Sequence, residues 1–156
     1  MKNFTKFFVS IFLVGYIKFA PGTWGTLASI VILLPLFKFL SLPLSILIIF
    51  YIILFFISNF LLVYSSLTKS YDSKHIVIDE LIGVFTIFLF YDVIFIYNDI
   101  ITITLIFFIF RFFDITKIYP ANFVDKNIKN GYGVILDDII AGIYTILTMI
   151  ILNVFI

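Results

Sequence analysis

Apolar segments of helical length alternate with short polar stretches along the whole chain. The apolar segments lie at residues 4–19, 21–39, 44–64, 79–97, 100–119 and 133–156. The segment at 44–64 exceeds the ~20 residues that a helix needs to cross a bilayer. The pattern predicts an all-α, polytopic helical membrane protein. About five membrane-embedded helices are expected, preceded by an amino-terminal helix at 4–19 that lies at the membrane interface.

Polar stretches between these segments are predicted as loops and turns. They lie at residues 65–75, 98–99 and 120–132. The first apolar segment resembles a signal peptide, because Lys2 and Lys6 precede it. Lys18 closes the apolar run early, so we expect the segment to be retained. A membrane-spanning helix at 4–19 is the alternative.

Composition narrows the class of protein. Hydrophobic residues make up 63% of the chain and mean hydropathy is +1.26, more than a soluble domain requires. The length of 156 residues suits a single membrane-embedded domain, residues 1–156. The absence of cysteine excludes disulfides and thiolate nucleophiles. A lone histidine excludes a multi-histidine zinc site within one chain, and the net charge of +1 gives no indication of a nucleic-acid partner.

Basic residues are distributed unequally between the two ends of the expected helices. If the amino terminus is cytoplasmic, nine basic residues fall on that side and only Lys38 falls on the other. The nine are Lys2, Lys6, Lys18, Lys69, Lys74, Arg111, Lys117, Lys126 and Lys129. Because loops rich in lysine and arginine stay in the cytoplasm, we expect this orientation.

The same orientation brings five carboxylates to the cytoplasmic face. They are Asp79, Glu80, Asp114, Asp137 and Asp138. Unpaired, this much negative charge near hydrocarbon would repel itself or take up protons. A hard divalent cation with oxygen ligands, magnesium or manganese, resolves the conflict. Acids at helix starts can also be simple caps, but two adjacent pairs and a further acid on one face favour a catalytic metal site.

Two glycines follow the acidic pairs at the same spacing. Gly83 follows Asp79 by four residues, and Gly142 follows Asp138 by four, so each glycine lies one turn beyond an acid on the same helix face. Small residues there let helices approach closely. We therefore expect Asp79, Asp114 and Asp138 to bind the metal. Glu80 and Asp137 are expected either to ligate it as well or to support the ligands.

Cationic and hydroxyl side chains accompany the acids. Arg111 and Lys117 lie three residues on either side of Asp114, so all three project from one helix face, and the two cations suit a phosphoryl group. Thr23 and Thr26 open an earlier helix, whose free amides can bind an anion. The alternatives are snorkelling anchors for the cations and an ordinary helix start for the threonines.

Four motifs stand in order along the chain. They read APGTWGTLAS at 20–29, IVIDELIG at 76–83, FRFFDITK at 110–117 and DKNIKNGYGVILDDIIAG at 125–142. Together they resemble the bacterial phosphatidylglycerophosphatase A family. One position departs from the family pattern, since Ile118 follows the lysine where the family usually has a proline.

The resemblance implies a magnesium-dependent phosphoric monoester hydrolase of the bacterial cytoplasmic (inner) membrane. Its lipid substrate would be phosphatidylglycerophosphate, its products phosphatidylglycerol and inorganic phosphate, and its active site would face the cytoplasm. On the matching positions the five carboxylates would form the catalytic acidic site, and Arg111 and Lys117 would hold the phosphate.

Other functions are weaker interpretations of the same residues. A thiolate phosphatase needs cysteine, and a histidine-dependent lipid phosphatase needs two histidines, whereas this chain has only His75. The remaining phosphatase mechanism is attack on a phosphomonoester by metal-activated water. A small carboxylate-gated cation or proton transporter is the alternative, although transporters usually carry their acids near the bilayer midplane. A structural subunit of a membrane complex would leave the acidic pairs unexplained.

Overall fold

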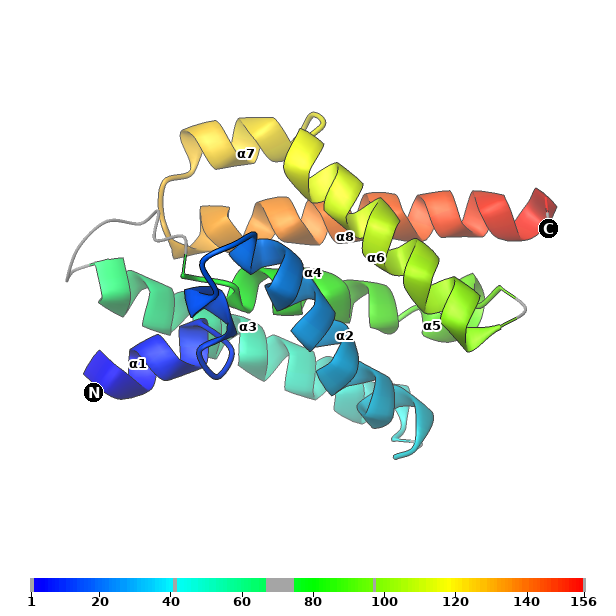
Figure 1. Cartoon of the computed structure of the whole chain (residues 1–156), viewed down its shortest axis with the longest axis horizontal. Coiled ribbons are helices and arrows are strands. Elements are labelled where there is room, and N and C mark those ends of the chain that lie inside the picture. The colour runs from blue at the N-terminus through cyan, green and yellow to red at the C-terminus, as the bar shows by residue number, and fades with distance from the viewer. Residues whose placement is uncertain (1, 41, 67–74, 97, 156) are drawn as a thin grey trace.

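The computed structural model describes residues 2–40, 42–66, 75–96 and 98–155. Every regular element in these ranges is helical (Figure 1), which confirms the all-α class. The elements are α1 (Lys2–Val9), the 3-10 turn η1 (Val14–Tyr16), α2 (Pro21–Lys38), α3 (Leu44–Ser66), α4 (Ile78–Phe88), α5 (Tyr91–Ile94), α6 (Asp99–Thr116), α7 (Ala121–Asn127) and α8 (Gly131–Phe155).

The short helix α4 forms the centre of the bundle. It packs against α8, α2 and α3, while α6 packs against α8 and α2 (Figure 1). Ten of the eleven residues of α4 are buried. The Phe85 ring contacts the rings of Phe37, Phe50 and Tyr51. Protein side chains therefore surround α4, whereas the outer helices keep many large apolar side chains exposed.

Three helices in the described part of the chain are long and apolar enough to cross a membrane. They are Pro21–Lys38, Leu44–Val63 and Gly131–Phe155. The central helix α4 is too short, because its eleven residues rise only ~16 Å against a hydrocarbon core of ~30 Å. The apolar helices indicate a membrane protein, and the number of about five embedded helices stays a prediction.

The expectation of one helix over residues 79–97 is wrong, because α4 ends at Phe88. The break contains neither proline nor glycine, and side-chain contacts of Tyr91 stabilise it instead. Tyr91 stacks on the ring of Phe88, and its hydroxyl donates a hydrogen bond to Asp99 Oδ1 (2.9 Å). These contacts hold the four-residue helix α5 against the start of α6.

The amino-terminal segment also differs from its prediction as one helix over residues 4–19. Helix α1 ends at Val9, and Ile11, Phe12 and Leu13 follow with φ angles of 45°, 53° and 72°. This left-handed region is unfavourable for residues with a Cβ, so the helix cannot continue through them. The interfacial position of the segment stays a prediction.

The same segment is docked on the residues that lead into α4. The amide of Val77 donates to Val9 O (3.0 Å), and His75 Nδ1 lies 2.9 Å from Gly15 O. The His75 ring stacks on Tyr16, with ring centroids 4.3 Å apart. His75 thus has a structural partner on η1, and the rest of the expected loop at 65–75 lies largely outside the described residues.

The predicted loop at 120–132 contains a helix, α7. Its approach from α6 is fixed by Tyr144 of α8, whose hydroxyl donates to Tyr119 O (2.6 Å) and whose ring packs on Phe113. These contacts come from residues far away in the sequence, so the local composition of 120–132 did not indicate the helix.

The two ends of the bundle hold different charged residues. Lys38 at the end of α2 forms an ion pair with Asp99 at the start of α6. At the opposite ends of the same two helices, a Cβ on Gly22 would lie 3.1 Å from Arg111 Nη1. The structure thereby separates Lys38 and Asp99 from the end that holds the predicted site.

Gly83 and Gly142 let α4 and α8 touch. A Cβ on Gly142 would lie 2.7 Å from Gly83 O, and one on Gly83 would lie 2.8 Å from Asp138 O. Contacts this short do not occur for real Cβ atoms, so both positions require glycine at the present helix separation. The close approach expected from the spacing is confirmed.

Gly142→Ala should therefore destabilise the protein by about 1–3 kcal/mol, the usual penalty of overpacking a core. The added methyl group meets backbone rather than a flexible side chain, so α8 must move away from α4. Thermal unfolding in detergent measures the effect. Ile143→Ala, at the adjacent and exposed position, is the control. Equal unfolding temperatures for Gly142→Ala and the unaltered protein would show that the helices can separate freely.

Candidate active site

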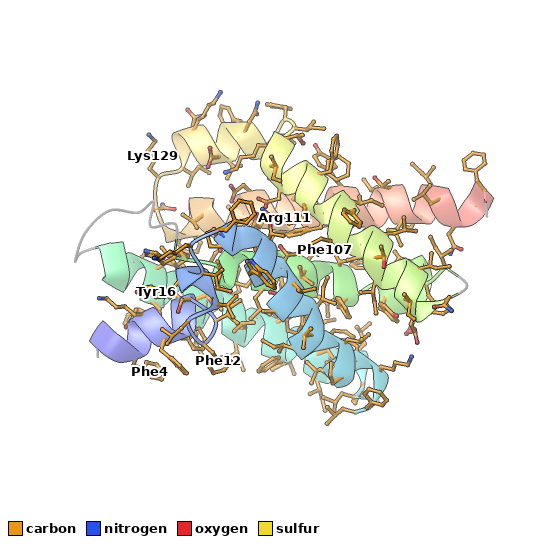
Figure 2. All side chains as sticks on the ribbon, viewed as in Figure 1. Phe4, Phe12, Tyr16, Phe107, Arg111 and Lys129 are labelled. Carbon is orange, nitrogen blue, oxygen red and sulfur yellow. The ribbon has the colours of Figure 1, made fainter. Side chains whose placement is uncertain are left out.

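Four helices contribute to a polar cluster inside the apolar bundle. The first turns of α4 carry Asp79 and Glu80, and the second turn of α8 carries Asp137 and Asp138. The last turns of α6 carry Arg111, which lies beside the first turns of α2 in Figure 2. Because α2, α4 and α8 begin where α6 ends, residues from distant parts of the sequence meet there.

Three carboxylates lie close enough to share one metal ion. One oxygen each from Asp79, Glu80 and Asp138 lies within 4.8 Å of the others. Ligands on opposite sides of magnesium are ~4.2 Å apart, since each bond is ~2.1 Å long. Glu80 and Asp138 are only 7% and 4% exposed. These three residues are called the acidic trio below.

Unsatisfied oxygens show that the acidic trio fits a cation. Asp79 Oδ1 and Glu80 Oε2 are buried and have no hydrogen-bond partner among the described residues. Buried polar atoms normally have a partner, and carboxylate oxygens are the ligands that magnesium prefers. The donor set therefore suits magnesium, and its three residues come from α4 and α8.

Asp114 was expected in the metal site but lies outside the acidic trio. Its Oδ2 accepts a hydrogen bond from Arg111 Nη1, and Arg111 Nη1 also lies 3.8 Å from Glu80 Oε1. Glu80 takes the place in the trio that we expected Asp114 to occupy. The spacing of three residues on α6 fits an Arg111–Asp114 ion pair equally well, so the sequence did not distinguish the two arrangements.

Arg111 links the acids to the start of α2. Its side chain is 15% exposed, and its Nε is buried without a hydrogen-bond partner among the described residues. A Cβ on Gly22 would lie 2.5 Å from Glu80 Oε1, so a larger residue there would displace the Glu80 side chain. The guanidinium therefore retains one N–H group without a partner among the described residues.

The two threonines of α2 differ in their contacts. Thr26 Oγ1 is 3.5 Å from Arg111 Nη1, which donates to it, and the hydroxyl itself donates to Gly22 O (3.0 Å). Thr26 therefore supports the arginine. The amide of Thr23 donates to Ala20 O (3.0 Å), so this amide is not free for an anion. Direct phosphate binding by either threonine stays a prediction.

Lys117 is held between two carboxylates. Its Nζ donates to Asp137 Oδ2 (2.7 Å) and to Asp125 Oδ1 (2.5 Å). Burial alone would lower the pKa of Lys117, but hydrogen bonds and charge from Asp125 and Asp137 outweigh it and raise the pKa above its usual value. Lys117 is therefore a permanent cation.

Asp137 is consequently engaged with Lys117 and lies outside the acidic trio, and Asp125 is a neighbour that the sequence did not single out. Asp125 lies eight residues beyond Lys117 on α7. The only sequence signal for it was its place at the start of the fourth motif. Recognising it required knowing that residues 121–127 are helical.

Two comparisons with known proteins agree on one family. The family model described as phosphatidylglycerophosphatase A matches residues 7–153, a range that includes every residue of the cluster. Phosphatidylglycerophosphatase A of Haemophilus influenzae (strain ATCC 51907 / DSM 11121 / KW20 / Rd) is 32% identical over 136 residues, which cover 86% of this chain and 80% of the relative. No solved structure matches the chain. The chain therefore belongs to the phosphatidylglycerophosphatase A family, a family of phosphoric monoester hydrolases.

Proposed function

We propose that the protein hydrolyses the terminal phosphomonoester of phosphatidylglycerophosphate to phosphatidylglycerol and inorganic phosphate, with magnesium, at the cytoplasmic face of the bacterial inner membrane. The observation that carries the proposal is the acidic trio, with Arg111 beside it, inside an apolar helical bundle. Family membership supports the substrate.

Asp79, Glu80 and Asp138 would hold the magnesium ion. When bound, magnesium would neutralise phosphate charge and lower the pKa of a coordinated water. The three residues come from the two helices that touch at Gly83 and Gly142. Their separation is therefore set by a backbone contact, which keeps the ligands in place before substrate arrives.

Arg111 would bind the phosphate oxygens. Asp114 and Thr26 fix its Nη1, and the partnerless Nε can donate to an oxygen of the substrate. Lys117 has three N–H groups, two of which bind carboxylates, so a third remains for the phosphate. As water oxygen bonds to phosphorus, the ester P–O bond breaks and the glycerol oxygen leaves as an alcohol after taking up a proton. Fixed positive charge stabilises this transition state.

The charge distribution supports the cytoplasmic orientation. Lys117, Lys126 and Lys129 belong to the end of the bundle that carries the acids, and Figure 2 labels Lys129 on the connection between α7 and α8. Lys38 belongs to the other end, where Asp99 neutralises it. Positive charge is typical of the cytoplasmic side. A lipid substrate would keep its acyl chains beside the exposed apolar faces while its phosphate reaches the acids.

The transporter interpretation receives no support from the family match. The acids of the trio also lie in the first turn of α4 and the second turn of α8, whereas transporters typically place such groups at unwound helices near the midplane. Hydrolysis explains the cations beside the acids as well.

The decisive experiment is phosphate release from phosphatidylglycerophosphate by the purified protein in mixed micelles. We expect release with magnesium, a fall of at least about a hundredfold with excess EDTA, and recovery when magnesium is restored. Phosphate release that is insensitive to EDTA would refute metal dependence. A lack of release from this lipid with magnesium present would refute the proposed substrate.

A further inference from the structure

The helix α7 is joined to the acidic cluster through one side chain. Asp125 on α7 accepts a hydrogen bond from Lys117 Nζ (2.5 Å), and the same Nζ donates to Asp137 on α8 (2.7 Å). The three residues, called the α7 bridge below, form a line from the surface inwards. The side chains are 45% exposed at Asp125, 33% at Lys117 and 8% at Asp137.

The inner end of the α7 bridge has a free oxygen. Lys117 Nζ donates a hydrogen bond to Asp137 Oδ2, while Asp137 Oδ1 is buried and has no hydrogen-bond partner among the described residues. Asp137 directly precedes Asp138 of the acidic trio. The direction in which Asp137 presents its free oxygen therefore depends on where Lys117 is held.

A lysine needs more than one anchor to be held in one position. The lysine side chain is a flexible four-carbon stem that ends in a compact charge, so an ion pair with a single carboxylate still allows many conformations. Asp125 supplies the second anchor, from an element that is itself fixed. The Tyr144 hydroxyl binds Tyr119 O (2.6 Å), just before α7 begins.

We propose that Asp125 is a positioning residue for the phosphatase reaction, acting through Lys117, whose ammonium it holds against Asp137. Asp125 is too exposed to be part of the buried site and lies outside the acidic trio, so its effect passes through the lysine. The inference rests on the proposed function and adds to it a residue on α7.

The test is a double-mutant cycle of Asp125→Asn and Lys117→Met, with phosphate release as the readout. Asp125→Asn keeps the shape but removes the charge. We expect a fall in kcat of about tenfold, typical for loss of a hydrogen bond between charged groups, with KM and the thermal unfolding temperature unchanged. Asp125→Glu should restore much of the kcat. The double variant should be no slower than Lys117→Met alone, because coupled residues are not additive.

Asp92→Asn, an exposed acid on α5, is the matched control and should retain full kcat. If the fall in kcat of the double variant equalled the product of the two single falls, the proposal would be overturned, because Asp125 would then act independently of Lys117. A parallel fall of unfolding temperature and kcat in Asp125→Asn would overturn it too, in favour of a purely structural role. If the unaltered protein is active and Asp125→Asn equals it, only this inference fails. If the unaltered protein releases no phosphate, the proposed function fails, and the inference with it.

Discussion

Asp138→Asn should reduce phosphate release by about a thousandfold or more, equivalent to ~4 kcal/mol of transition-state stabilisation. The change removes one of the three carboxylates whose oxygens lie within 4.8 Å of one another, and asparagine is a poor substitute for a charged magnesium ligand. Folding should survive, because removal of one like charge from a buried cluster relieves repulsion. Phosphate release across a magnesium titration, with unfolding temperature measured in parallel, checks both expectations.

The control for this variant is Asp92→Asn, which removes an exposed acid outside the cluster. It should change neither rate nor unfolding temperature. If Asp138→Asn kept normal activity at every magnesium concentration, Asp138 would not be a ligand. Asp79 and Glu80 would then have to hold the ion without α8.

Arg111→Lys should lower kcat by about a hundredfold or more, the scale of losing a preorganised donor to a developing charge. Lysine keeps the positive charge, but it lacks the planar fork that binds two oxygens together. It also cannot reproduce the contacts that Arg111 makes with Asp114 and Thr26 while offering Nε to a phosphate. Steady-state kinetics on detergent-solubilised enzyme measure the loss, and circular dichroism should show unchanged helix content.

Lys126→Ala removes a positive charge on α7 and should leave kcat close to normal. A fully active Arg111→Lys variant would mean that the arginine serves Asp114 and Glu80 as a structural counter-charge, which lysine can also supply. The comparison separates phosphate recognition from general positive charge, since both substitutions are made at the same end of the bundle.

The convergence of the acids was predictable because its causes are local in sequence. Hydrophobic segments and the charges at their ends indicate which helix ends share a side of the membrane. The four-residue spacing from Asp79 to Gly83 and from Asp138 to Gly142 indicates which faces touch. The structure bears out this contact, with a Cβ on Gly142 only 2.7 Å from Gly83 O.

The errors arose where side-chain contacts formed in the folded protein override local preference. The end of α4 at Phe88 has no proline or glycine and depends on Tyr91 contacting Asp99. Helix α7 depends on Tyr144 binding Tyr119 O. Neither pair is visible from periodicity, because each joins residues whose proximity follows only from the folded arrangement.

The pairing of charged side chains within the cluster could not be predicted from the sequence either. Asp114 and Asp137 also belong to the motifs, yet they accept hydrogen bonds from Arg111 and Lys117. The composition gives the number of charged residues. Only the side-chain geometry decides which carboxylate pairs with a cationic side chain and which is left unpaired.

The burial of α4 has a consequence for how the site comes into being during membrane insertion. A helix of eleven residues, inserted alone, would leave polar ends in hydrocarbon, where no water satisfies them. Its neighbours α2, α3 and α8 are the helices that can each cross by themselves. If they enter the membrane first, α4 gains its protein surroundings only once they enclose it. In that order of insertion, Asp79 and Glu80 would meet Asp138 only when the bundle closes, so a half-inserted chain would lack the acidic trio that the proposed reaction requires.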